Sequence, residues 1–416
     1  MRFDTIITTI GLIGTTLTAP LQAAEEEKAL SLPQLLEEAR QSNPDLLAAR
    51  KRWEAAKAKI PLATGLPAPT IGVEWEEIPR GTIKVNQATL MYQLIQSIPF
   101  PGKLSAKHRV AVAEAQVAAM GFKQAENDVL SQLKSVYYDI YLLDRRLELQ
   151  QAQQLWAEQL ASSARTNYAT GKATYTDMVR AQAEAASAAT MIETLHHRRE
   201  AMAAHLNHLV NHPIGHAPAS PGPIVLTPLP FSPEELRLIA QERQPELLMF
   251  KYAAERADAS LKLAKRELLP DLQTMVELRD PAMGPLGPWD LSLALVLPFW
   301  FWTKLRYGVR VAMYDKESAQ AASQAMHNEI ARRIHEQWHE AAAAYAQAKT
   351  AESLIPLSQQ AVASSLAAYQ AGRGSLAEAL EALRLLAEQQ RTYDEQLVQF
   401  EQHVVMLEQA SGGELR

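Results

Sequence analysis

The sequence repeats itself once, and this duplication limits the possible folds more than any other feature. At an offset of 201 positions, turn and cap residues coincide: Ser31 with Ser232, Pro44 with Pro245, Pro69 with Pro270, Arg109 with Arg310, and Gly171 with Gly372. A repeat of this length indicates two copies of one structural unit rather than a short solenoid. We expect the units at residues 24–211 and 231–416.

A proline-rich stretch separates the two units. Seven of the 23 prolines lie between His212 and Pro233. Proline locks the backbone and removes a hydrogen-bond donor, so such a stretch excludes helix and central strand. Residues 212–230 are therefore predicted to be an extended linker.

Each unit opens with residues typical of a helix start. Ser31 with Gln34, and Ser232 with Glu235, have the spacing of a capping box, in which a hydroxyl and a side chain satisfy each other's backbone donors. Helix resumes after Pro44 and after Pro245.

After Pro69 and Pro270 the sequence alternates between apolar and polar residues, which is the period of a strand. Residues 70–76 and 271–279 are predicted to be strands, as are the segments around Tyr92 and from Trp289 to Leu297. Tilted strands of about 9–11 residues cross a bilayer. A half-buried hairpin of a soluble protein would give the same alternation.

Two very long helices follow the strands. Residues 104–168 and 305–369 are rich in Ala, Leu, Glu and Gln and contain one proline, Pro356. One uninterrupted helix of this length would extend for roughly 100 Å. Gly171 and Gly372 suit the left-handed cap at which a helix ends, and returning helices are predicted to run to about Val210 and Ala410.

Composition excludes several classes of function. The net charge of −6 argues against a nucleic-acid partner, which needs a basic face. The absence of cysteine removes thiolate metal sites and disulfides. The sequence contains no H-E-x-x-H, G-x-S-x-G or phosphate-binding glycine loop. We therefore expect no enzyme activity and no cofactor.

The N-terminus has the features of a secretory signal peptide at residues 1–23. Arg2 precedes an apolar stretch at 6–17, and Gln22-Ala23-Ala24 supplies small residues for cleavage. No later stretch approaches the roughly 20 apolar residues of a membrane-spanning helix. We expect an exported protein that crosses a membrane as a β-barrel or not at all.

An aromatic cluster lies where the last strand gives way to helix. In "PFWFWTK", Trp300 and Trp302 stand beside Lys304, and the first unit has Pro101, Gly102 and Lys103 at the same junction. Aromatic rings and Lys collect at a membrane–water interface, so we expect this junction at such an interface. A local cluster that packs the junction is compatible with this interpretation.

The order of elements, the motifs "QSIPFPGKLSAKHRVA" and "LPFWFWTKLRYGVRVA", and the turns "YATGKATYTDMVRAQ" and "YQAGRGSLAEALEA" resemble the TolC family of outer membrane factors. The resemblance covers essentially the whole mature chain. It implies a mainly α fold with a membrane β-barrel portion, in which a homotrimer combines four strands per protomer into a 12-stranded barrel and long helical hairpins into a periplasmic tunnel.

Strand number alone also requires oligomerisation. Four strands cannot close a membrane barrel, whose minimum is about eight, and an open sheet edge is not tolerated in lipid. A dimer and a trimer both satisfy this requirement, and the resemblance implies the trimer.

The resemblance further implies the partners and the location. The protein would lie among outer-membrane lipids, extend into the periplasm, and serve as a passive duct for a periplasmic adaptor and an inner-membrane pump. The "PFPGK" junction favours the branch that exports heavy-metal cations. The alternatives are drug efflux, type I secretion, or a soluble periplasmic coiled-coil scaffold.

The resemblance also implies a gate at the helical turns. The matching acidic residues are Glu378 and Glu381, with Asp177 as the counterpart of Glu378 in the first unit. In a trimer they would form carboxylate rings that prefer cations. Lys172 and Arg373 follow the turn glycines and would face the adaptor or pump. Each of these residues could instead be an ordinary solvated residue.

Six of the eleven histidines lie between His196 and His216. The spacing of His208 and His212 would suit a metal ion. No carboxylate accompanies them in the sequence, however, so we expect exposed histidines near the linker and no metal site.

Overall fold

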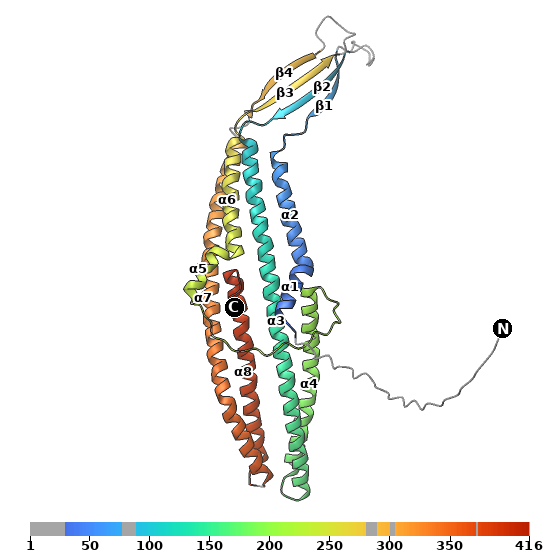
Figure 1. The fold of residues 1–416 in the computed structure, drawn as a ribbon, viewed down its shortest axis with the longest axis vertical. Coiled ribbons are helices and arrows are strands. Elements are labelled where there is room, and N and C mark those ends of the chain that lie inside the picture. The colour runs from blue at the N-terminus through green and yellow to red at the C-terminus, as the bar shows by residue number, and fades with distance from the viewer. Residues whose placement is uncertain (1–29, 77–88, 280–288, 300–303, 372, 416) are drawn as a thin grey trace, which may run out of the picture.

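The computed structural model describes residues 30–76, 89–279, 289–299, 304–371 and 373–415. The predicted signal peptide, Gly372, Trp300 and Trp302 lie outside these residues. The molecule is long and narrow, with a sheet at one end and helices running away from it (Figure 1).

The two units contain the same elements in the same order. The first consists of α1 (Leu32–Ser42), α2 (Pro44–Thr64), β1 (Thr70–Glu76), β2 (Thr89–Ile98), α3 (Lys103–Ala169) and α4 (Tyr175–Val210). The second consists of α5 (Pro233–Arg243), α6 (Pro245–Arg266), β3 (Asp271–Arg279), β4 (Trp289–Val296), α7 (Lys304–Gln370) and α8 (Leu376–Ser411). Every helix of the second unit begins 201 residues after its counterpart, which confirms the duplication.

The helices α3 and α7 run the full length of the helical part (Figure 1). The helix α2 lies along the sheet-proximal half of α3, and α4 returns along the other half. The helices α6 and α8 accompany α7 in the same way. The two hairpins α3–α4 and α7–α8 therefore end together at the pole far from the sheet.

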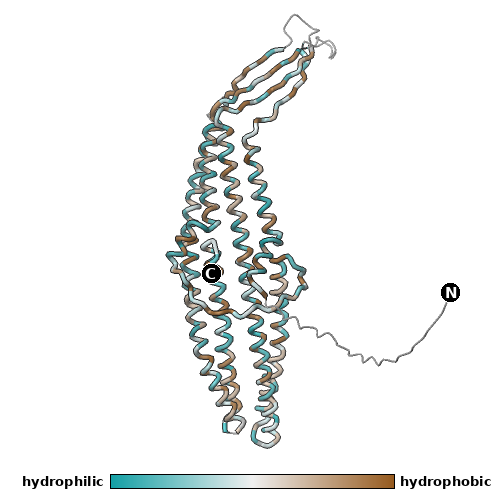
Figure 2. The backbone as a smooth tube through the Cα atoms, viewed as in Figure 1, coloured by the Kyte–Doolittle hydropathy of each residue, from teal (hydrophilic) through white to brown (hydrophobic). Residues whose placement is uncertain are grey.

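The sheet is antiparallel, with the order β1-β2-β3-β4, so β1 and β4 are its edges. Its register pairs Leu94 with Val276, and Val276 with Leu291. Large apolar side chains on the strands are exposed, including Ile71 at 79% and Leu293 at 67%. Apolar residues alternate with polar ones along the strands (Figure 2). Such exposure is expected where the solvent is lipid.

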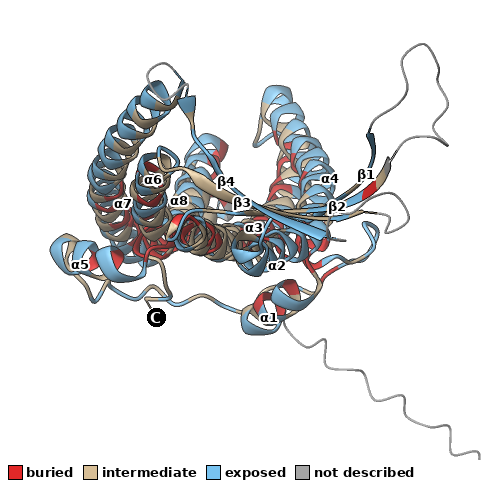
Figure 3. Ribbon diagram, turned by 90° about the horizontal axis from the view of Figure 1, so that it is seen from above, coloured by how far each residue is buried: buried red, intermediate tan, exposed pale blue. Residues whose placement is uncertain are grey.

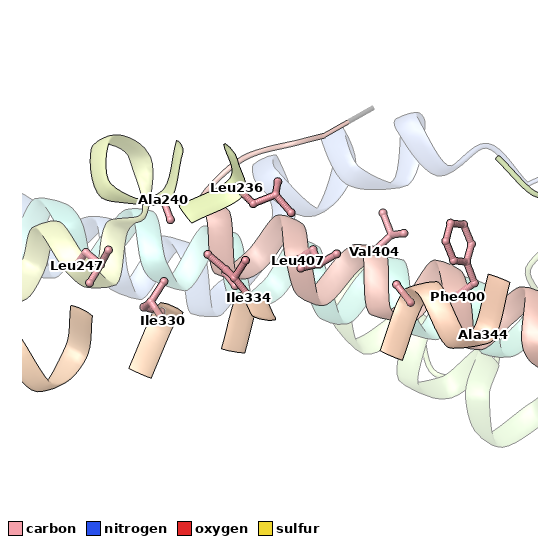
Figure 4. Packing of buried hydrophobic residues seen from close by; sticks show 11 residues of the cluster. Leu236, Ala240, Leu247, Ile330, Ile334, Ala344, Phe400, Val404 and Leu407 are labelled. Carbon is pink, nitrogen blue, oxygen red and sulfur yellow. The ribbon is translucent and has the colours of Figure 1, made fainter. Parts of the chain in front are cut away.

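The largest buried cluster of the described residues packs the helices of the second unit against one another, near the middle of the molecule. Leu236 on α5, Ile330 on α7 and Phe400 on α8 are each at most 1% exposed, and they belong to one cluster that extends along the helices (Figure 4). The first unit has an equivalent cluster around Leu36, Leu133 and Leu206. These clusters dock the short helices α1 and α5 onto the long ones, on the convex side of the arc of helices (Figure 3).

The two predicted capping boxes differ in outcome. Ser232 and Glu235 form the box at the start of α5, as predicted. The prediction for Ser31 and Gln34 is wrong, because the Ser31 side chain makes no capping hydrogen bond. Pro33 occupies the second helical position of α1 and has no N–H to donate, so one of the two usual donors is missing there.

Candidate functional site: the tips of the helical hairpins

The two hairpin turns share equivalent backbone hydrogen bonds. The Lys172 N–H donates to the Asn167 carbonyl at 2.8 Å, and the Arg373 N–H donates to the Ala368 carbonyl at 2.9 Å. Gly171 has a φ of 72°, in the left-handed region that glycine adopts without a Cβ clash. Lys172 and Arg373 are both exposed. The duplication thus extends to individual hydrogen bonds of the turn.

Two of the predicted gate carboxylates cap the helices that follow the turns. Asp177 accepts from the Thr174 N–H at 3.1 Å and from the Thr174 hydroxyl at 2.7 Å. Glu378 accepts from the Ser375 N–H at 3.2 Å, and its own N–H donates to the Ser375 hydroxyl at 3.2 Å. Both are capping boxes. A Ser or Thr followed three residues later by Asp or Glu is a sequence signature that would have identified them.

Glu381, one helical turn beyond Glu378, is exposed. Within the described part of the chain its carboxylate makes no hydrogen bond or ion pair. Glu381 is therefore free to act on ions or on a partner, whereas Glu378 also stabilises the start of its helix.

The two tips are joined to each other. Leu160 on α3, Ala181 on α4 and Leu380 on α8 belong to one buried cluster with Tyr369 of α7. Beside it, the Arg384 guanidinium lies 3.1 Å from the Glu184 carboxylate, so α8 is tied to α4. Both side chains line a cavity of about 150 Å³. Sequence reasoning missed this pair, because nothing local in the chain relates α4 to α8.

The junction between sheet and helices carries a second set of predicted residues. Gly102 has a φ of 91° and is the N-cap residue of α3. Lys103 is 7% exposed, and its Nζ lies 2.8 Å from the Asp271 carboxylate and donates to the Leu269 carbonyl at 2.7 Å. The Pro101 carbonyl accepts from Arg266 at 3.4 Å. Lys103 therefore ties the first unit to the second, while Lys304 is exposed.

Comparison with protein families decides what this architecture is. The model of the family described as outer membrane efflux protein matches residues 35–212 and 237–413, once for each unit. The chain belongs to this family. No curated protein has a significantly similar sequence.

Solved structures share the fold of this efflux protein. The outer membrane protein VceC from Vibrio cholerae is 18% identical, with a TM-score of 0.79 over 92% of this chain and 97% of VceC. A membrane protein from Pseudomonas aeruginosa is 19% identical, with a TM-score of 0.79 over 92% of this chain and 90% of that one. CusC is 15% identical, with a TM-score of 0.78 over 92% of each chain.

The efflux protein is accordingly a channel of the outer membrane that extends into the periplasm, and it is not an enzyme. This confirms the family and the fold class expected from the sequence. Among the described residues, no helix has both the length and the apolar character needed to span a membrane.

The histidine stretch differs from expectation in one respect. A carboxylate does accompany His212, because its Nε2 lies 2.6 Å from the Glu38 carboxylate on α1. The His212 and His216 rings lie 5.3 Å apart. The helix α4 ends at Val210, so His212 does not continue the helical face of His208. In the described part of a single protomer, no three His, Asp or Glu side chains are placed to hold a metal ion.

Proposed function

We propose that three copies of this efflux protein assemble into one export duct, which a periplasmic adaptor and an inner-membrane pump open and drive. The observation that carries this proposal is the pair of unpaired sheet edges. β1 and β4 each pair on one side only, and an edge exposed to lipid leaves backbone groups without hydrogen bonds. Pairing β4 of one copy with β1 of the next removes both edges and closes a barrel of twelve strands.

The helical part supports the same assembly. Seen along the molecule, the helices form an arc with α7 at one end and α4 at the other (Figure 3). An arc of three identical segments closes into a tube. The tube would continue the barrel into the periplasm as a tunnel.

We place the gate at the hairpin tips, where the adaptor or pump would act. Glu378, Glu381 and Asp177 would supply rings of carboxylates around the axis. Lys172 and Arg373 would supply six exposed cations, two from each protomer, for contact with an acidic surface of the partner. The Arg384–Glu184 pair would hold the two hairpins of one protomer together until that contact is made.

The proposed substrates are heavy-metal cations. Rings of carboxylates concentrate cations and repel anions at a constriction, and Glu381 is exposed without a partner among the described residues. We also propose that residues 1–23 are removed on export, and that 24–211 and 231–416 act as two units joined by the linker at 212–230.

Growth tests of a deletion strain examine the substrate. Cells that lack the gene are challenged with copper, silver, zinc, cobalt and cadmium salts, and in parallel with drugs and detergents. We expect sensitivity to metals that is reversed by the wild-type gene. Sensitivity confined to drugs and detergents would keep the channel and overturn the metal substrate.

A further inference from the structure

Four histidines lie on two helix edges that have no neighbouring helix within the described protomer. His335 and His339 are exposed on α7, with ring centroids 4.5 Å apart. His196 and His197 are exposed on α4. The His197 Nδ1 lies 3.6 Å from the Glu200 carboxylate, with side chains 72% and 79% exposed.

The orientation of α7 leaves these rings on its free side. Gln337 faces α8, where its side chain contacts His403 at 2.8 Å. Trp338 faces the linker and donates to the Phe231 carbonyl at 2.9 Å. His335 and His339 therefore lie on the remaining edge of α7, which is the helix at the end of the arc (Figure 3).

Within the protomer, the seam between α3 and α8 shows what such an edge contacts. Lys134 pairs with Glu408 at 2.7 Å, and Arg145 lies 3.5 Å from Asp394. The Tyr138 hydroxyl lies 3.3 Å from the Glu401 carboxylate. Around them, Tyr141 packs on Leu397 and Val398. Of the acidic residues in this seam, Asp394, Glu401 and Glu408 are 2–9% exposed.

Because the chain is duplicated, we expect an equivalent seam between neighbouring copies. The helix α7 is the repeat of α3, and α8 is the repeat of α4, each at an offset of 201. In the proposed trimer, α7 of one copy meets α4 of the next as α3 meets α8. In this second seam, His339 takes the position that Tyr138 has in the first. Glu200 of the partner subunit takes the position of Glu401.

The replacements gather imidazoles at one place. The positions of Leu397 and Val398 are occupied by His196 of the partner subunit and His197 of the partner subunit. The bulky Tyr141 becomes Ala342, which leaves room between the helices. His339 would thus lie beside two partner imidazoles and one partner carboxylate, with His335 one turn away.

The same replacements change the distribution of charge in this seam. Lys134 becomes His335, and its partner Glu408 becomes the neutral Asn207. Arg145 becomes Ala346, and its neighbour Glu148 becomes Lys349. Carboxylates remain at Glu193 and Glu200. Arg332, next to this edge, is already paired with Glu329 and Glu336 on its own helix. Burying a carboxylate without a cation is costly. At the Lys134 position, an imidazole therefore stands in the seam between copies where the seam within the protomer has an ammonium group.

We propose that a divalent transition-metal ion binds among these imidazoles at each of the three seams. Its ligands come from His335 and His339 of one copy and from the edge of α4 that carries His196, His197 and Glu200 of the partner subunit. Imidazole and carboxylate suit Zn²⁺ and its neighbours, and two histidines four residues apart on one helix face are a metal-binding arrangement. Each protomer carries two half-sites, which is consistent with the lack of a complete site among the described residues of one protomer.

The seam itself is tested without metal. Because the chain has no cysteine, the double variant His339→Cys with Glu200→Cys introduces the only thiols. Under mild oxidation we expect disulfide-linked oligomers up to the trimer on non-reducing gels. The matched control, His403→Cys with Glu200→Cys, places the first thiol on the α8 side and should give no such linkage.

The metal is tested by titrating the detergent-solubilised, chelator-treated full-length protein with Zn²⁺ alone in a calorimeter. We expect three sites per trimer, with affinity at least tenfold weaker in His339→Ala and in His197→Ala. The control His212→Ala with His216→Ala changes two histidines of the same stretch whose rings contact each other, His212 lying beside Glu38 of α1. It should leave the affinity unchanged. Light scattering checks that each variant remains trimeric.

The outcomes separate this proposal from the assembly on which it rests. A wild-type protein that is not trimeric overturns the assembly and the seam together. A trimer that forms no His339–Glu200 disulfide, binds no Zn²⁺, or loses Zn²⁺ only in the His212/His216 variant overturns the metal site and leaves the channel standing. Disulfide linkage with three His339-dependent zinc ions supports it.

Discussion

The Arg384 guanidinium on α8 lies 3.1 Å from the Glu184 carboxylate on α4, and this pair joins the two hairpins of one protomer near their tips. If separation of the hairpins opens the duct, Arg384→Ala should raise the open probability in planar bilayers several-fold. An exposed pair contributes about 0.2–1 kcal/mol, but the trimer contains three of them.

Arg391→Ala is the matched control for this prediction. Arg391 pairs with Glu388 on its own helix, so it joins no two hairpins. Equal conductance of wild type, Arg384→Ala and Arg391→Ala would show that the Arg384–Glu184 pair does not restrain the channel.

Charge and capping at the tip can be separated, because Gln also serves at the third position of a capping box. Glu378→Gln with Glu381→Gln should lower the preference for cations, measured as a reversal potential across a KCl gradient. Ser375→Ala should lower stability by about 1 kcal/mol through loss of the cap and leave the reversal potential unchanged. A double Gln variant that selects cations as wild type does would remove both residues from the constriction.

The boundaries of the helices could be predicted from the sequence because their causes are local. Pro69, Pro270 and the turn glycines stop or turn the chain whatever surrounds them, and the predicted start of the first long helix at Leu104 is one residue from the observed Lys103. The capping roles of Asp177 and Glu378 were also readable, because both partners lie within four residues.

Contacts between distant segments could not be predicted in this way. Arg384 and Glu184 are 200 positions apart, and Lys103 meets Asp271 only because the second unit folds against the first. The repeat predicts that two equivalent units exist. It does not predict which helices of the two units pack on each other. The side chains that meet in the seam between α3 and α8 are therefore known only from the structure.

Gly102 should not tolerate a side chain. Its φ of 91° is costly for an L-residue, by about 1–2 kcal/mol, and a Cβ there would overlap the Arg266 guanidinium that donates to Pro101. Gly102→Ala should lower the thermal midpoint followed by circular dichroism. Gly121→Ala should instead raise the thermal midpoint. Nothing lies within 4 Å of the added Cβ in α3, so the higher helix propensity of Ala should stabilise the folded protein by about 0.5–1 kcal/mol.

Asp139, in the seam between α3 and α8, should make stability depend on pH. Burial raises the pKa of its carboxyl, and the hydrogen bond from Gln402 offsets this only in part. Because the folded state holds this proton more tightly than the unfolded state, the contribution of Asp139 to stability falls as pH rises from 3.8 through the raised pKa.

Asp139→Asn cannot ionise and can still accept from Gln402. It should therefore raise the denaturation midpoint at pH 7, and the advantage over wild type should vanish as pH falls below about 3.8, the ordinary pKa of Asp. Asp144→Asn is the contrasting control, because it weakens a pair with Arg199 at 2.5 Å and should lower the midpoint at pH 7. An advantage of Asp139→Asn that persists unchanged at low pH would contradict the assigned cause.

Phe400 on α8 belongs to the largest buried cluster of the described residues and is 0% exposed. Phe400→Ala removes the ring that contacts Tyr345, whose centroid lies 5.7 Å away, and leaves a cavity. Such truncations cost about 3–5 kcal/mol, so the urea midpoint should fall sharply. Met406→Ala, on the same helix but 43% exposed, should cost much less. Similar losses for both variants would mean that this cluster does not dominate the stability of the helical part.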